Sequence, residues 1–139
     1  MPDKFESGTP NLVGIVGLHY GIKFINQVGL EEIKKKDMFL IKRLYDNLKN
    51  VSNVILYTKR HQEEYNSAIL SFNVKNKDSE TVAQFLNKNY NIALRAGLHC
   101  SPLAHITYNT IEQGAVRVSP SYFNCAKDID ILSYAINKI

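Results

Sequence analysis

The chain has 139 residues, of which 45% are hydrophobic and 22% are charged, and this composition is typical of one soluble globular domain rather than of a disordered chain. No apolar run approaches the roughly 20 residues that a membrane span needs, and the sequence opens without a secretory signal, so we expect a cytoplasmic protein without membrane contact. The net charge of +4 comes mainly from lysines interspersed with acidic residues, which argues against a nucleic-acid-binding surface.

Two helices are predicted in the first third of the chain. Residues 10–28 carry apolar side chains at helical spacing on more than one face of the helix. Residues 30–49 show a single apolar stripe opposite a charged face. Because the first helix is apolar on more faces than one sheet can cover, we expect it to pack on something outside this chain, either a partner subunit or a further domain.

The rest of the chain predicts short strands and further helices. Segments rich in β-forming residues predict strands at 54–57, 67–74, 91–95 and 115–119. Asp78 or Ser79 can cap a third helix, and Asn124 can cap the last one. This order of elements predicts an α+β fold, with helices packed on a mostly antiparallel sheet of about four strands.

The long segment 96–114 has no clear period, and a loop of this length in a compact domain is more often functional than connecting. It contains Cys100 next to His99, and it is flanked by Arg95 and Arg117. A loop cysteine beside cationic and imidazole side chains is the setting in which nucleophilic cysteines occur. The alternative is an inert cysteine that serves as a small apolar side chain, and the residues alone leave both open.

The cysteine and histidine content limits the other kinds of site. The two cysteines are too few for a disulfide framework, and Cys125 at the start of the last predicted helix is interpreted as structural. His99, Cys100 and His105 could supply three metal ligands, but no fourth ligand stands at a familiar spacing. We therefore predict no metal site.

The segment 5–11 (FESGTPN) precedes the first predicted helix. Its glycine, the hydroxyl of Thr9 and the helix N-terminus together could donate hydrogen bonds to an anion. Ser7 or Thr9 could instead cap the helix, and without further information capping is the preferred interpretation.

Three motifs stand in order along the chain: 5–11 (FESGTPN), 95–100 (RAGLHC), and 116–119 (VRVS) followed by 122–124 (YFN). Together they resemble the C-terminal part of a pyridoxal-phosphate-dependent cysteine desulfurase of the class V aminotransferase family. The resemblance covers nearly the whole chain. It implies that residues 1–139 form a single domain, the small C-terminal domain of a longer fold-type I enzyme.

In that family, the cysteine of this loop takes the sulfur atom of a cysteine substrate, leaving alanine, and passes it to a sulfur-acceptor protein. The resemblance implies that Cys100 is the sulfur-accepting nucleophile. It also implies that Arg117, supported by Arg95, binds the substrate carboxylate, for which a guanidinium is well suited. Thr9, with Gly8, would reach the cofactor phosphate of the neighbouring protomer in a homodimer.

The resemblance also implies what this chain lacks. The Schiff-base lysine of the family lies in a larger N-terminal domain, and no lysine here stands in a matching segment, so we expect the chain neither to bind pyridoxal phosphate nor to be active alone. Residues 1–28 would lie at the interface with that domain or with the dimer partner. Asn109 stands where we expect a glycine. The alternatives are a class V aminotransferase or selenocysteine lyase fragment, and a non-catalytic binding protein or persulfide carrier.

Overall fold

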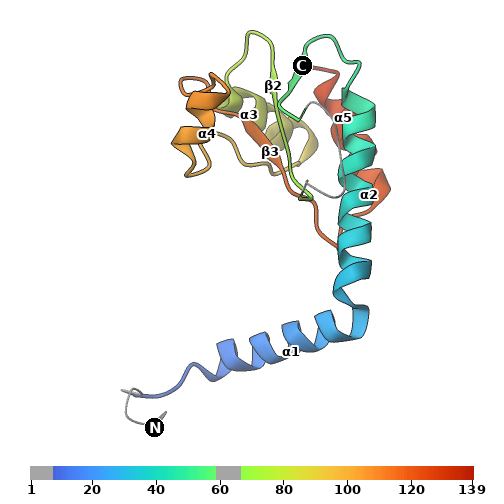
Figure 1. Ribbon diagram of the computed structural model, residues 1–139, viewed down its shortest axis with the longest axis vertical. Coiled ribbons are helices and arrows are strands. Elements are labelled where there is room, and N and C mark those ends of the chain that lie inside the picture. Colours follow the sequence, from blue (N-terminus) through green and yellow to red (C-terminus); the bar gives the residue numbers. More distant parts are fainter. Residues whose placement is uncertain (1–7, 59–66) are drawn as a thin grey trace. The chain divides into compact units, whose positions relative to one another are not determined.

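The computed structural model describes residues 8–58 and 67–139 (Figure 1). The chain divides into two compact units, Met1–Ile33 and Lys34–Ile139. The first unit holds helix α1 (Leu12–Val28), and α2 (Leu30–Leu48) continues from it into the second. The remaining elements all belong to the second unit: β1 (Val54–Leu56), β2 (Leu70–Val74), α3 (Ser79–Tyr90), α4 (Pro102–Thr107), β3 (Val116–Val118) and α5 (Ala126–Ile136).

Helix α1 is capped by Asn11 before its first residue and by Gly29 after its last. The Asn11 side chain accepts a hydrogen bond from the backbone N–H of Gly14 at 3.0 Å, so Asn11 is the cap rather than Thr9; Ser7, the other expected cap, lies outside the described residues. Gly29 ends the helix with a φ of 89°, which a glycine adopts without a Cβ clash. No residue of α1 is buried within the chain. Among the described helices, none combines the length and hydropathy that crossing a membrane requires.

The sheet of the second unit is antiparallel and has the strand order β1-β2-β3. Ser71 of β2 lies opposite Arg117 of β3. The expected strand at 91–95 contributes one bridge, in which Arg95 lies opposite Arg117 and its carbonyl accepts the Arg117 N–H at 2.8 Å. The chain leaves α3 through Asn91 in the left-handed conformation (φ 55°) and approaches β3 only at Arg95. The antiparallel sheet is confirmed, with three strands in place of about four.

One face of the sheet packs on helices to form the core. Val116 and Val118 are buried there, whereas Arg117 between them points to the opposite face, because side chains alternate along a strand. The apolar stripes predicted for the second and last helices are confirmed for most of their members, which are buried: Leu40, Leu44 and Leu48 in α2, and Ile129, Leu132, Ala135 and Ile136 in α5. Their end members, Ile33 and Ile139, are half-buried. Each large apolar side chain buried in this way contributes roughly 1.5–3 kcal/mol.

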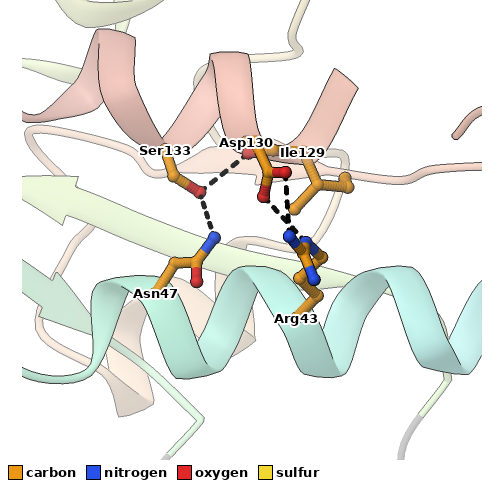
Figure 2. A network of polar contacts seen from close by, with 5 residues as sticks. All are labelled: Arg43, Asn47, Ile129, Asp130 and Ser133. Carbon is orange, nitrogen blue, oxygen red and sulfur yellow. Dashed lines mark hydrogen bonds and ion pairs between the residues drawn. The ribbon is translucent and has the colours of Figure 1, made fainter. Parts of the chain in front are cut away.

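Helices α2 and α5 run side by side and share a polar network at their surface (Figures 1 and 2). Arg43 donates two hydrogen bonds to Asp130, at 2.7 and 2.8 Å. Asn47 donates to the Ser133 hydroxyl at 3.0 Å, and that hydroxyl donates to the carbonyl of Ile129 at 2.7 Å. The hydrogen bonds from Arg43 hold the pKa of Asp130 below its ordinary value. The two-point contact fixes the register of the two helices.

The caps of α3 and α5 differ in how well the sequence predicts them. The Asp78 side chain accepts a hydrogen bond from the first turn of α3, as predicted. Helix α5 is capped by Cys125 and not by Asn124, and the carboxylate of Asp128 accepts the Cys125 N–H at 2.9 Å in a capping box. Asn124 is unavailable as a cap because its side chain accepts the N–H of Ser121 in the preceding turn.

The segment 97–114 is closed at its base by two glycines. A Cβ atom on Gly114 would lie 2.7 Å from the Cα of Gly97 and 2.7 Å from the hydroxyl of Ser79. Ser79 is buried, accepts the N–H of Gly97 at 3.2 Å and donates to the carbonyl of Gln113 at 2.8 Å. We call these residues, Ser79, Gly97, Gln113 and Gly114, the stem.

Gly114→Ala is expected to lower the free energy of unfolding by about 1–3 kcal/mol more than Gly97→Ala does, because only the first places a Cβ against other atoms. Both glycines have positive φ, 63° and 99°, but a Cβ on Gly97 meets nothing within 4 Å. The φ of Gly97 is further than that of Gly114 from the left-handed minimum of about 57°. The control variant Gly97→Ala therefore carries at least as much backbone strain as Gly114→Ala, and the difference between the two reports the Cβ contact. Urea denaturation followed by circular dichroism measures both variants, and equal losses would contradict close packing at the stem.

Candidate functional site

Segment 96–114, predicted to lack regular structure, contains a tight turn followed by a short helix. The N–H of Ser101 donates to the carbonyl of Leu98 at 2.9 Å, which closes a turn around His99 and Cys100. Helix α4 follows at once, with Pro102 in its first turn. Its six residues are too few to show a helical period, and a proline placed where a helix can begin is the one signal that could have predicted it.

The turn holds Cys100 in a strained backbone conformation. His99 and Cys100 have φ values of 52° and 58°, and positive φ at both central residues defines a type I′ turn, which glycine and asparagine favour. For residues with a Cβ this conformation costs roughly 1–2 kcal/mol each. Such strain is characteristic of functional sites. Asn109, where the resemblance led us to expect a glycine, also has positive φ (53°), which asparagine tolerates.

Cys100 lies beside Arg95, which is itself opposite Arg117. The Cys100 side chain is exposed, and the Nη2 atom of Arg95 lies 3.6 Å from its Sγ atom, in hydrogen-bond contact. Because Arg95 and Arg117 are opposite each other in an antiparallel bridge, their side chains leave the same face of the sheet. Within the described residues, the ion pairs join other side chains, and neither arginine takes part in one. Like charges placed opposite each other are unfavourable unless an anion lies between them.

Arg117 lines two cavities. One, of about 430 Å³, lies between the segment after α3, the end of β3 and α5, and Arg95 also lines it. The other, of about 340 Å³, is lined by His99, His105 and hydroxyl groups such as that of Ser71. Both volumes suit a small molecule. The Nε atom of Arg117 is buried without a hydrogen-bond partner. No lysine is among the described residues that line either cavity.

His99 connects the turn to β3. A carbonyl only accepts, so the Nε2–H of His99 donates to the carbonyl of Ala115 at 2.9 Å, and Nδ1 is the buried nitrogen without a partner. Burial lowers the pKa of His99, the bond to Ala115 opposes this, and the charge of Arg117 lowers it further. The ring is therefore neutral at neutral pH. It lies 5.9 Å from the ring of the buried His105, whose Nδ1 atom is 2.8 Å from the Thr110 hydroxyl.

The structure thus brings three of the predicted site residues together, Cys100, Arg95 and Arg117. Gly8 and Thr9 belong to the first unit, where both are exposed. Among the residues that the structure describes, no three His, Cys, Asp or Glu side chains are grouped to hold a metal. Sequence reasoning missed the part played by Ser79 in the stem, and it considered this residue only as a possible cap.

Comparison with known proteins gives the family. The sequence model for aminotransferase class-V matches residues 1–132. The chain belongs to this family. A probable cysteine desulfurase from Methanothermobacter thermautotrophicus is 32% identical over 99% of this chain and 34% of its own length. A cysteine desulfurase from Wigglesworthia glossinidia brevipalpis is 32% identical over 100% of this chain and 32% of its own.

Solved structures of cysteine desulfurases are similar to this chain. The apo cysteine desulfurase from Thermococcus onnurineus NA1 matches with a TM-score of 0.84 and 29% identity, over 99% of this chain and 33% of that one. A cysteine desulfurase from Escherichia coli, described as the S-sulfonic acid form, matches 97% of this chain with a TM-score of 0.81 and 25% identity. These likenesses confirm the predicted α+β fold and the resemblance. The chain spans about a third of the length of these relatives, so it corresponds to part of a cysteine desulfurase-like enzyme.

Cys100→Gly is expected to raise the free energy of unfolding above that of Cys100→Ala by about 1 kcal/mol, because glycine alone removes the left-handed penalty. The same pair of replacements, alanine and glycine, at the exposed Gln84 inside helix α3 forms the control. There the backbone is helical, so glycine offers no relief and is expected to be less stable than alanine by about 1 kcal/mol. Urea denaturation of the four variants measures both differences, and the same order at both positions would show that the turn is not strained.

Proposed function

We propose that this chain supplies the sulfur-accepting part of a cysteine desulfurase, with Cys100 as the nucleophile and with Arg117 and Arg95 binding the substrate carboxylate. The contact of the Cys100 Sγ atom with Arg95 at 3.6 Å, together with the Arg95–Arg117 bridge, carries the proposal. These two contacts bring the Cys100 thiol and the guanidinium groups of Arg95 and Arg117 to one face of the sheet. The planar guanidinium matches a carboxylate through two parallel hydrogen bonds.

In the proposed reaction, the thiolate of Cys100 attacks the sulfur of a cysteine substrate. The new S–S bond forms as the carbon–sulfur bond of the substrate breaks, and the carbon keeps the electron pair and takes a proton to give alanine. The sulfur remains as a persulfide on Cys100 and is then passed to an acceptor thiol. The family implies pyridoxal phosphate in the full enzymes, and when bound it supplies the electron sink that lets this carbon release sulfur. Arg117 and Arg95 hold the substrate in line with Cys100.

We infer that most of the cofactor site lies outside this chain. No lysine lines either cavity among the described residues, so the residues here fit the substrate and the nucleophile but not the Schiff base. The exposed Gly8 and Thr9 would donate to the cofactor phosphate of a neighbouring protomer in a homodimer. Residues 1–28, which include a largely apolar helix with no buried residue, would pack at the interface with the N-terminal domain or with that protomer.

A chimera tests the reaction. In it, this chain replaces the matching third of the Methanothermobacter relative, pyridoxal phosphate is added, and alanine formation from cysteine is measured. Cys100→Ser is expected to lower the rate at least about 100-fold, because the nucleophile is lost. Cys125→Ser is the matched control and is expected to leave the rate unchanged. Cofactor absorbance shows that each chimera is assembled. Alanine formation that survives Cys100→Ser contradicts the proposal, and transamination that does not need Cys100 favours the aminotransferase alternative.

Labelling of the chain by itself tests whether it binds the cofactor. Pyridoxal phosphate is added to the 139-residue chain, the mixture is reduced with borohydride, and modified lysines are mapped by mass spectrometry. We expect no single lysine to be labelled stoichiometrically and no sulfide to be released from cysteine. Stoichiometric labelling of one lysine, with sulfide release that depends on Cys100, would show that the chain holds a complete site.

A further inference from the structure

We propose that His99 is a positioning residue for Cys100, and that its hydrogen bond to the carbonyl of Ala115 ties the turn carrying the thiol to the strand carrying Arg117. The inference rests on the proposed function, because it concerns the distance between the same thiol and the same arginine. It assigns a role to a side chain that contacts neither the sulfur nor a carboxylate.

Ala115, the residue directly before β3, makes two hydrogen bonds to the segment 97–114 that carries Cys100, which we call the thiol segment. Its N–H donates to the carbonyl of Gly97 at 3.1 Å, and its carbonyl accepts the Nε2–H of His99 at 2.9 Å. Ala115 itself is buried and stands two residues before Arg117. Both backbone groups of one buried residue, directly before β3, therefore hold the segment that contains Cys100.

The turn needs such a tie because its backbone is unfavourable. His99 and Cys100 are both left-handed, and the Ser101 to Leu98 bond closes the turn without fixing it to the sheet. A side chain that reaches from the turn to β3 supplies that connection. It also fixes the direction in which Cys100 leaves the turn, since the two residues are adjacent.

Only one end of the His99 ring makes this contact. The Nε2 atom donates to Ala115, whereas Nδ1 is buried without a partner. The rest of the ring lies near the ring of His105. In length, the side-chain amide nitrogen of glutamine corresponds to Nε2, and that of asparagine corresponds to Nδ1. Glutamine therefore can keep the bond to Ala115, while asparagine is too short to reach it.

Two alkylating reagents measure the placement of the thiol against the arginines in the 139-residue chain. Iodoacetate carries a carboxylate and iodoacetamide is its neutral counterpart, and each loses iodide as its carbon bonds to the cysteine sulfur. The ratio of the two rates is measured by mass spectrometry at Cys100 and divided by the same ratio at Cys125, which is an internal control. We expect a preference for iodoacetate at Cys100 of roughly tenfold, from the local positive charge. Arg117→Gln is expected to reduce it.

His99→Asn is expected to lose most of this preference, and His99→Gln to retain most of it. Asparagine is the better residue for a left-handed turn, so an effect of turn strain alone would give the opposite order. Circular dichroism shows that each variant is folded. Equal ratios in the two variants, or a variant order reversed from this one, would overturn the role of His99. A wild-type ratio at Cys100 no greater than at Cys125 would instead count against the proposed function, because the arginines would not face the thiol.

Discussion

The contact between Gly97 and Gly114 is the constraint on which the site depends. Their backbones come so close that a Cβ on Gly114 would collide with Gly97, and the buried Ser79 hydroxyl bonds to Gly97 and Gln113 on either side. From the middle strand, the buried Asn73 amide donates to the carbonyl of Gly114 at 2.8 Å. The stem therefore brings both ends of the thiol segment together just before β3, and the first residue of α3 holds them there.

One face of the sheet forms the core, and the other carries the candidate site. Val116 and Val118 are buried in the core, and Arg117 between them lines both cavities. The short strand β3 therefore contributes side chains both to the core and to the candidate site. The unfavourable features gather on the side away from the core, since the opposed arginines and the left-handed turn at Cys100 lie there. The apolar packing on the other face offsets their cost.

Features that depend on local pattern could be predicted from the sequence, and features that depend on distant contacts could not. The stripes of α2 and α5 and the cap at Asp78 follow from residues a few positions apart. The stem does not, because Ser79 bonds to residues 18 and 34 positions away, and nothing near it distinguishes it from an ordinary first helical residue. The bridge at Arg95 in place of a full strand has the same origin, because it is made with Arg117, 22 positions further along the chain. For the candidate site, motifs predicted Cys100, Arg95 and Arg117, but the turn that presents the thiol has no sequence signal of its own.

The second unit holds the candidate site with contacts of its own. The core of the second unit is closed by side chains from α2, α3 and α5 against its own sheet, so the stem and the turn are held by contacts within this unit. On the opposite face the thiol is exposed, and within the described residues neither arginine pairs with a carboxylate. A unit with a complete core and an open cationic face is suited to be completed by something anionic from outside. Under the proposed function, the rest of the enzyme then has to supply only the cofactor and the opposing wall, because the nucleophile and the carboxylate-binding groups are already in place.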